Sequence, residues 1–278
     1  MAVIAQITDP HMRPPGLLTL GQIDAAGFLA AAVDTIIAKH GEIDAVVVTG
    51  DLTDLGESDA YTHAAMLLSR FSVPVIVVPG NHDRTGPMRE VFEAYGGLGR
   101  SEVEGKMCFA VAAGDATVIA LDTSVDGLGE DIHHGTLGEA QLEWLDATLA
   151  ASGQTLIAMH HPPFEVDISF MDAIGLTDRE AFAAIIAEHD NVSRIACGHV
   201  HRAIVGEVAG VPALAIPSVA HQVQFSVSAE LTPAFVMEPA TYAIHLLRDG
   251  RATSHIGYVN DFGGPVPYPE KSGHRAYE

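Results

Sequence analysis

Seven side chains that can bind metal ions come at or just after the ends of short apolar runs. They are two carboxylates, one amide and four imidazoles: Asp9, His11, Asp51, Asn81, His160, His199 and His201. The set offers oxygen and imidazole nitrogen but no thiolate, which suits Mn, Fe(II), Co or Zn without choosing among them. A single polar residue in such a place would be an ordinary turn, but five separate runs ending this way favour a shared site.

The number of these ligands fits two divalent cations. Asp51 stands alone between the other groups along the chain, so it is the natural carboxylate to bridge the two ions. Two metals roughly 3.5–4 Å apart can hold the attacking and leaving oxygens of an in-line displacement at phosphorus. The ions would also supply the positive charge that a phosphate needs and that an acidic chain lacks.

The apolar runs that lead to these residues are predicted to be buried strands, because they are rich in β-branched residues and stop at turn residues. Five such strands are Val3 to Ile7, Ala45 to Thr49, Val75 to Val78, Thr155 to Met159 and Val192 to Cys197. The first three alternate with helical apolar spacing at Ile23 to His40 and Glu57 to Phe71, which predicts parallel strands with right-handed crossovers. Their carboxyl ends then share one edge, where open α/β sheets place their sites.

Further elements follow from the same patterns. Helices are expected at Leu137 to Leu149 and Asp178 to His189, and strands at Met107 to Val111, Thr117 to Leu121 and Pro212 to Ile216. The dipeptide Asp249-Gly250 between Tyr242 to Leu247 and Thr253 to Tyr258 predicts a β-hairpin.

The composition restricts the partners. A formal net charge of −22 over 278 residues argues against nucleic acid and against anionic membranes. Only two cysteines occur, which fits a reducing compartment. No segment has transmembrane length and no signal peptide is recognisable, so we expect a cytoplasmic protein. We expect one domain over residues 1–260, with residues 222–240 as a flap over the site or a homo-oligomer contact, and residues 261–278 as an irregular tail.

The polar blocks resemble a known family when they are taken together. In order and approximate separation they resemble the five blocks of the calcineurin-like metallophosphoesterases: Asp9-x-His11, Gly50-Asp51, Gly80-Asn81-His82-Asp83, His160-x-Pro162 and Gly198-His199-x-His201. Within that superfamily the chain is most similar to bacterial cyclic-nucleotide phosphodiesterases and glycerophosphodiesterases. That narrower resemblance rests on three segments, which are His160 to Pro163, Gly135 to Leu145 and Pro217 to Gln222.

The resemblance implies a fold, two cofactors and residue roles. The fold is α/β, a two-sheet sandwich flanked by helices, and the cofactors are two divalent metal ions. One ion would be held by Asp9, His11, Asp51 and His201, and the other by Asp51, Asn81, His160 and His199. His82 would contact the phosphate or protonate the leaving oxygen, and Asp83 would orient His82. Attack on phosphorus would come from a metal-bound hydroxide, with Asn81 helping to stabilise the phosphoryl oxygens.

One position departs from a related group in the superfamily. Purple acid phosphatases place a tyrosine ligand three residues after the bridging aspartate, where this chain has Asp54. We therefore expect no tyrosinate-to-iron charge-transfer band.

Other histidines are weighed separately. His221 is expected to touch the substrate or else to be a loop histidine. His161 is expected to pack or to hydrogen bond beside a ligand. His133 and His134 lie in a Gly-flanked loop that could reach the cleft, and of the two alternatives we favour exposed loop histidines.

The leading hypothesis is a binuclear-metal phosphodiesterase acting on small diesters, either 3′,5′-cyclic nucleotides or glycerophosphodiesters. A phosphomonoesterase, which includes protein phosphatases, is the rival within the enzyme class, because the ligands do not separate the two. A non-catalytic scaffold that binds a protein partner is disfavoured, because such a chain should have lost ligands and here all seven are present with His82.

Overall fold

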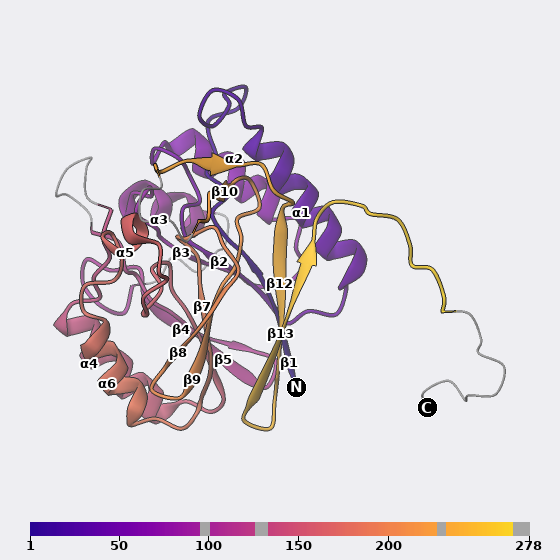
Figure 1. Cartoon of the computed structure of the whole chain (residues 1–278). Coiled ribbons are helices and arrows are strands. Elements are labelled where there is room, and N and C mark those ends of the chain that lie inside the picture. Colours follow the sequence, from indigo (N-terminus) through magenta and orange to yellow (C-terminus); the bar gives the residue numbers. More distant parts are fainter. Residues whose placement is uncertain (95–100, 126–132, 227–231, 269–278) are drawn as a thin grey trace.

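Two β-sheets pack face to face between two layers of helices in the computed structural model, which describes residues 1–94, 101–125, 133–226 and 232–268 (Figure 1). One core cluster lies between the sheets and includes Val47 and Ile76 from the first sheet and Leu156 and Ala196 from the second. The two other large clusters lie between each sheet and its helices. The sandwich flanked by helices that the resemblance implied is therefore confirmed.

The first sheet has the strand order β13-β12-β1-β2-β3. Strands β1, β2 and β3 are parallel, whereas β12 runs antiparallel to β1 and pairs with β13 in the predicted hairpin. The bounds of its strands are β1 (Ala2–Ile7), β2 (Ala45–Thr49), β3 (Val75–Val78), β12 (Thr241–Arg248) and β13 (Arg251–Tyr258).

The second sheet has the order β4-β5-β6-β7-β9-β8, with β5, β6, β7 and β9 parallel. Its strands are β4 (Phe109–Ala113), β5 (Ala116–Ala120), β6 (Thr155–Ala158), β7 (Val192–Cys197), β8 (Ile204–Val208) and β9 (Val211–Ala215). A separate two-stranded ribbon pairs β10 (Gln222–Val223) with β11 (Phe235–Val236).

Helices cover the outer face of each sheet. The helices are α1 (Ala25–Lys39), α2 (Ser58–Leu68), α3 (Thr85–Ala94), α4 (Glu139–Ala151), α5 (Ser169–Asp172) and α6 (Arg179–Ala187). Leu29 of α1 and Tyr61 of α2 belong to the cluster against the first sheet, and Leu145 of α4 and Phe182 of α6 to that against the second. No helix in the described ranges is long and apolar enough to cross a membrane.

Burial on both faces explains why the strands have almost continuous apolar sequences. In β2, Val46 and Val48 face the helices, while Ala45 and Val47 face the second sheet. The predicted strands therefore match the structure to within a few residues. Helix α1 begins at Ala25, two residues later than predicted, because the Asp24 carboxylate accepts a hydrogen bond from the Gly27 amide at 3.0 Å and caps the helix.

The strands that lead to the seven ligand-type residues are divided between the sheets. Asp9, Asp51 and Asn81 follow β1, β2 and β3, whereas His160 and His199 follow β6 and β7. Helix α3 and the short strand β8 lie where the sequence patterns predicted no element. Residues 261–268 form neither helix nor strand, and residues 269–278 lie outside the described part.

Candidate metal centre

The first group of ligand-type side chains surrounds a point at the carboxyl ends of β1 and β7. It consists of Asp9, His11, Asp51 and His201, whose candidate ligand atoms lie within 4.8 Å of one another. His201 Nε2 is 3.3 Å from Asp9 Oδ1 and 3.1 Å from His11 Nε2, and His11 Nε2 is 3.6 Å from Asp51 Oδ2. All four residues are buried, so their polar atoms require partners.

The second group lies on the other side of Asp51. Its oxygen Oδ2 is 3.4 Å from His160 Nε2. Asn81 Oδ1 is 3.1 Å from His160 Nε2 and 2.9 Å from His199 Nδ1. Asp51 therefore lies between the two groups, and its Oδ1 also accepts a hydrogen bond from the His82 amide at 2.9 Å.

Backbone carbonyls fix the ring orientation of two of these histidines. His160 Nδ1 donates to the carbonyl of Thr49 at 2.8 Å, and His201 Nδ1 donates to the carbonyl of His221 at 2.7 Å. Each bond places the proton on Nδ1, so the lone pair of Nε2 is turned toward the carboxylates. Histidines that bind metals are typically held in this way.

The backbone is strained at five of the seven ligand-type residues. These non-glycine residues have positive φ angles between 45° and 69°: Asp9, His11, Asp51, His199 and His201. L-residues rarely adopt this left-handed conformation, and it costs about 1–3 kcal/mol for each residue. The surrounding fold therefore stabilises an arrangement in which the chain turns sharply at the strand ends and directs these side chains into one place.

Two glycines allow the close approach of chain segments at the site. A Cβ on Gly80 would lie 2.2 Å from Asp51 Oδ1, and one on Gly198 would lie 2.2 Å from Thr8 Oγ1. Neither position therefore accommodates a side chain without displacing its neighbour. Thr8 Oγ1 in turn donates to Asp9 Oδ2 at 2.6 Å, which holds that carboxylate in place.

Neighbouring imidazoles keep the Asp51 carboxylate charged, whereas burial keeps the imidazoles of His199 and His161 neutral. Burial raises the pKa of Asp51, but the neighbouring His160 and His82 hold that pKa well below its ordinary value. Burial lowers the pKa of His160, but the Asp51 carboxylate raises it more, to about 9. Burial holds the pKa of His199 well below its ordinary value and lowers that of His161 to about 3. A charged carboxylate and neutral imidazoles are the forms that bind a metal ion, so binding of an ion would release the proton that Asp51 favours on His160.

His82 lies beside the first group, with its ring centroid 4.8 Å from that of His11. Its Nδ1 donates to the carbonyl of Asp54 at 2.9 Å. The Asp54 carboxylate lies 3.5 Å from His11 Nδ1 and 3.6 Å from Arg13, and Arg13 forms two hydrogen bonds with Glu57. Asp54, which the sequence marked only as a departure from the tyrosine of purple acid phosphatases, thus contacts both His11 and His82.

Asp83 does not have the contacts that we expected for it. Its carboxylate accepts hydrogen bonds from the amides of Leu52, Thr53 and Gly80 at 2.9–3.0 Å and from the hydroxyl of Tyr61 at 3.0 Å. These bonds join the segments after β2 and β3. The orientation of His82 that we assigned to Asp83 comes instead from the carbonyl of Asp54.

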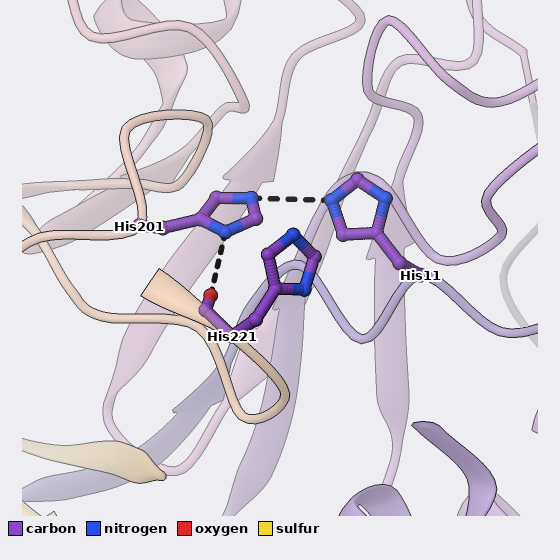
Figure 2. Close-up of side chains that lie close together, drawn as sticks. All are labelled: His11, His201 and His221. Atoms are coloured by element: carbon purple, nitrogen blue, oxygen red, sulfur yellow. Dashed lines mark hydrogen bonds between the residues drawn. The ribbon is translucent and has the colours of Figure 1, made fainter. Parts of the chain in front are cut away.

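His221 lies against the first group (Figure 2). Its ring centroid is 5.1 Å from that of His11 and 4.8 Å from that of His201. Within the described ranges its buried Nδ1 has no hydrogen-bond partner. His221 therefore lies where a ligand at the centre would meet it, and its contact with substrate stays a prediction.

His133 lies in a loop but is half-buried against the site, so the favoured alternative of an exposed histidine is wrong and the other, a loop that reaches the cleft, is confirmed. Its Nδ1 accepts a hydrogen bond from Asn81 Nδ2 at 3.1 Å, and its carbonyl accepts one from His161 Nε2 at 2.9 Å. The bond to Nδ2 keeps Asn81 Oδ1 turned toward His160 and His199. His161 Nδ1 also bonds the hydroxyl of Thr123 at 2.7 Å, so His161 is held beside the ligands as predicted. The Gly-flanked sequence around His133 indicated a loop that could reach the cleft but not the contact with Asn81.

The residues present fit divalent metal ions. Lone-pair atoms of carboxylates, an amide and imidazoles face one another at 2.9–3.6 Å in a buried space. His199 Nε2 is also buried without a hydrogen-bond partner among the described residues. Such a set of oxygen and nitrogen donors suits two ions that share Asp51.

Comparisons with known proteins identify the family. The sequence profile of the calcineurin-like phosphoesterases matches residues 2–203, which contain all seven ligand-type residues. The chain belongs to the calcineurin-like phosphoesterase family. A probable cyclic nucleotide phosphodiesterase from Rhodopseudomonas palustris is 35% identical to this phosphoesterase over 241 residues, which cover 85% of each chain.

Two other relatives match over nearly the whole length. A probable glycerophosphodiester phosphodiesterase from Arcobacter nitrofigilis is 29% identical over 275 residues, which cover 98% of both chains. The 3′,5′-cyclic adenosine monophosphate phosphodiesterase of Escherichia coli is 30% identical and covers 93% of this phosphoesterase and 90% of its own length.

Solved structures share the fold at low sequence identity. A dimetal phosphatase from Danio rerio matches with a TM-score of 0.67 and 18% identity over 94% of this chain and 97% of its own. A purple acid phosphatase from yellow lupin matches with a TM-score of 0.65 and 15% identity over 93% of this chain and 51% of its own. At these identities the matches show the fold alone.

Proposed function

We propose that the protein is a phosphodiesterase that uses two divalent metal ions to hydrolyse small phosphodiesters, either 3′,5′-cyclic nucleotides or glycerophosphodiesters. The observation that carries this proposal is the pair of ligand groups on either side of Asp51, with His82 beside them. The names of the relatives support the diester class, because they include cyclic nucleotide and glycerophosphodiester phosphodiesterases.

The ligand sets divide at Asp51. In this proposal Asp9, His11 and His201 hold one ion, Asn81, His160 and His199 hold the other, and Asp51 contacts both. The oxygen and nitrogen donors suit Mn, Fe, Co or Zn. When bound, such ions supply positive charge for the phosphate and activate water at neutral pH.

His82 would assist the leaving oxygen. Its Nδ1–H donates to the carbonyl of Asp54, and although burial lowers the pKa of His82, the Asp51 carboxylate raises it above its ordinary value. In the protonated ring Nε2–H is therefore free to give its proton to the departing alkoxide, which leaves His82 neutral. An alkoxide is a poor leaving group, and a diester of this kind therefore needs such a donor more than an aryl ester does. Asn81 and His221 would contact the substrate, since both lie beside the ligand groups.

The location of the protein is part of the same proposal. Cys108 and Cys197 are both free and buried, which is the usual state of cysteines in a reducing compartment, and we therefore place the enzyme in the cytoplasm. A homo-oligomer remains a prediction.

The test compares substrates on protein stripped of metal by a chelator and then supplied with Mn, Co, Zn or Fe(II). We expect kcat/KM for bis(p-nitrophenyl) phosphate to exceed that for p-nitrophenyl phosphate, and activity to require the added metal. A higher kcat/KM for the monoester would be consistent with the metal site but would show that the protein is a phosphomonoesterase. Equal turnover with and without metal would overturn the proposal.

A further inference from the structure

The β10–β11 ribbon brings an aromatic ring to the edge of the metal centre. The Phe235 ring on β11 lies edge-on to His221, with ring centroids 5.5 Å apart and planes at 79°. The same His221 ring is about 5 Å from the rings of His11 and His201. Phe235 is only partly buried, so part of its side chain remains exposed beside the metal centre.

A second aromatic ring and a guanidinium lie at the same ribbon. Arg202 directly follows the ligand-type His201, and its Cζ lies 6.0 Å from the centroid of the Phe225 ring. Arg202 donates hydrogen bonds to the carbonyl of Val223 at 3.1 Å and to the carboxylate of Glu238 at 2.6 Å. The guanidinium is therefore held by β10 and by the segment that follows β11. Phe225, two positions after the half-buried Val223 of β10, is 52% exposed.

The ribbon is tied to the metal centre through its first strand. Gln222 Nε2 donates to the carbonyl of Ser218 at 2.9 Å. The Ser218 hydroxyl donates to the carbonyl of Asp9 at 2.7 Å. These hydrogen bonds fix the position of β10 relative to the first ligand group.

We propose that Phe225, Phe235 and Arg202 form a wall that binds the planar base of the substrate, which makes 3′,5′-cyclic nucleotides the preferred diesters over glycerophosphodiesters. This inference rests on the proposed function and names the substrate class for the same site. Aromatic rings and guanidinium planes bind nucleobases by stacking, whatever the base, because every base has a π-face. A glycerol group has no such face, so the same wall gives it little binding energy.

The test measures the contribution of the base alone. The two probes are 5′-AMP and ribose 5-phosphate, which share the sugar and the phosphate and differ by the base. Isothermal titration calorimetry of the Mn-loaded protein gives both dissociation constants without any turnover. We expect 5′-AMP to bind about tenfold more tightly, which is within the range for stacking one base on an aromatic ring.

Three variants and a control complete the experiment. Phe225→Ala and Phe235→Leu should each bring the ratio of the two dissociation constants close to one, whereas Phe225→Trp should preserve it. Phe262→Ala is the matched control, because Phe262 is 70% exposed but lies in the C-terminal segment beyond β13. It should leave the ratio unchanged.

Each outcome decides the inference separately from the proposed function. A wild-type ratio near one, or a ratio that the ring variants do not change, would overturn the aromatic wall even if diester hydrolysis is metal-dependent. A variant that alters only the sedimentation coefficient would assign these rings to a contact between copies of the chain. Absence of diester turnover with a normal tenfold ratio would instead refute the proposed function and leave the base-binding wall standing.

Discussion

Replacing Gly80 by alanine should disable the metal centre through one added methyl group. The backbone at Gly80 does not have the positive φ angle that disfavours side chains, so the substitution itself brings no backbone strain. The added Cβ would lie 2.2 Å from Asp51 Oδ1 and 2.4 Å from Asp51 N, whereas ordinary contact begins near 3.4 Å. Asp51 and the segment after β2 must therefore move by about 1 Å, more than the roughly 0.5 Å that a catalytic arrangement tolerates.

The expected loss follows from this displacement. A misplacement of about 1 Å costs on the order of 100-fold in rate. That factor corresponds to about 2.7 kcal/mol of transition-state stabilisation. Because Asp51 lies between both ligand groups, we also expect the Gly80→Ala protein to bind less metal after equal loading.

The assay is kcat/KM for bis(p-nitrophenyl) phosphate on Mn-loaded protein, with metal content measured on the same samples. Gly86→Ala is the control, because a Cβ on Gly86 meets nothing within 4 Å. It should retain wild-type activity, and circular dichroism should show both variants folded. If folded Gly80→Ala protein keeps its activity within about threefold of wild type, the close approach of Gly80 to Asp51 does not matter for catalysis and the reasoning is refuted.

The remaining predictions concern other parts of the centre. Asp51→Ala should abolish metal-dependent turnover in a folded protein, and an unchanged kcat would remove Asp51 from the mechanism. Asp54→Asn should weaken metal binding about 10–100-fold in a chelator competition, since it disturbs the carboxylate beside His11; wild-type affinity would show that Asp54 does not position the ligand. His82→Ala should reduce kcat/KM more for 3′,5′-cyclic AMP than for bis(p-nitrophenyl) phosphate, and equal losses would argue against proton donation. Metal at 100 times its dissociation constant should stabilise the fold by about 2.7 kcal/mol, so chelation should lower the melting temperature, and a melting curve insensitive to chelator would contradict the buried site.

The strands and their polar ends could be predicted from local sequence. Runs such as Val75 to Val78 are apolar on both faces because each strand is covered on one side by helices and on the other by a sheet. The residues that follow them, such as Asn81 and His160, are polar where the strand ends. Each of these signals lies within a few neighbouring residues, so the sequence contains it directly.

The partition into two sheets could not be predicted from such patterns. A buried strand has the same apolar pattern in either sheet, so nothing in Thr155 to Ala158 indicates that it pairs with β5 and β7 rather than with β3. The left-handed backbone at Asp9, Asp51 and His199 could not be predicted either, because only a few per cent of non-glycine residues adopt it, even though Asp and His do so more often than most. The resemblance to a family supplied the sandwich that the patterns alone left open.

The misplaced residues depend on contacts between distant segments. His133 accepts a hydrogen bond from Asn81, which is 52 positions away in sequence. The residues next to His133 predicted a loop but not this partner. We expected Asp83 to orient His82 because the two residues are adjacent. Its carboxylate instead accepts hydrogen bonds from backbone amides that are 30 and 31 positions away in sequence. Proximity in sequence therefore identified the right residues at this turn but not their partners.

The central claim is that two metal ions share Asp51, and the most direct test is a titration of metal-free protein with Mn(II). The number of ions bound per chain is measured together with the rate of bis(p-nitrophenyl) phosphate hydrolysis. We predict that activity reaches its maximum at two ions per chain and that Asp51→Ala protein binds fewer. Full activity at one ion per chain, or two ions bound without Asp51, would contradict the account.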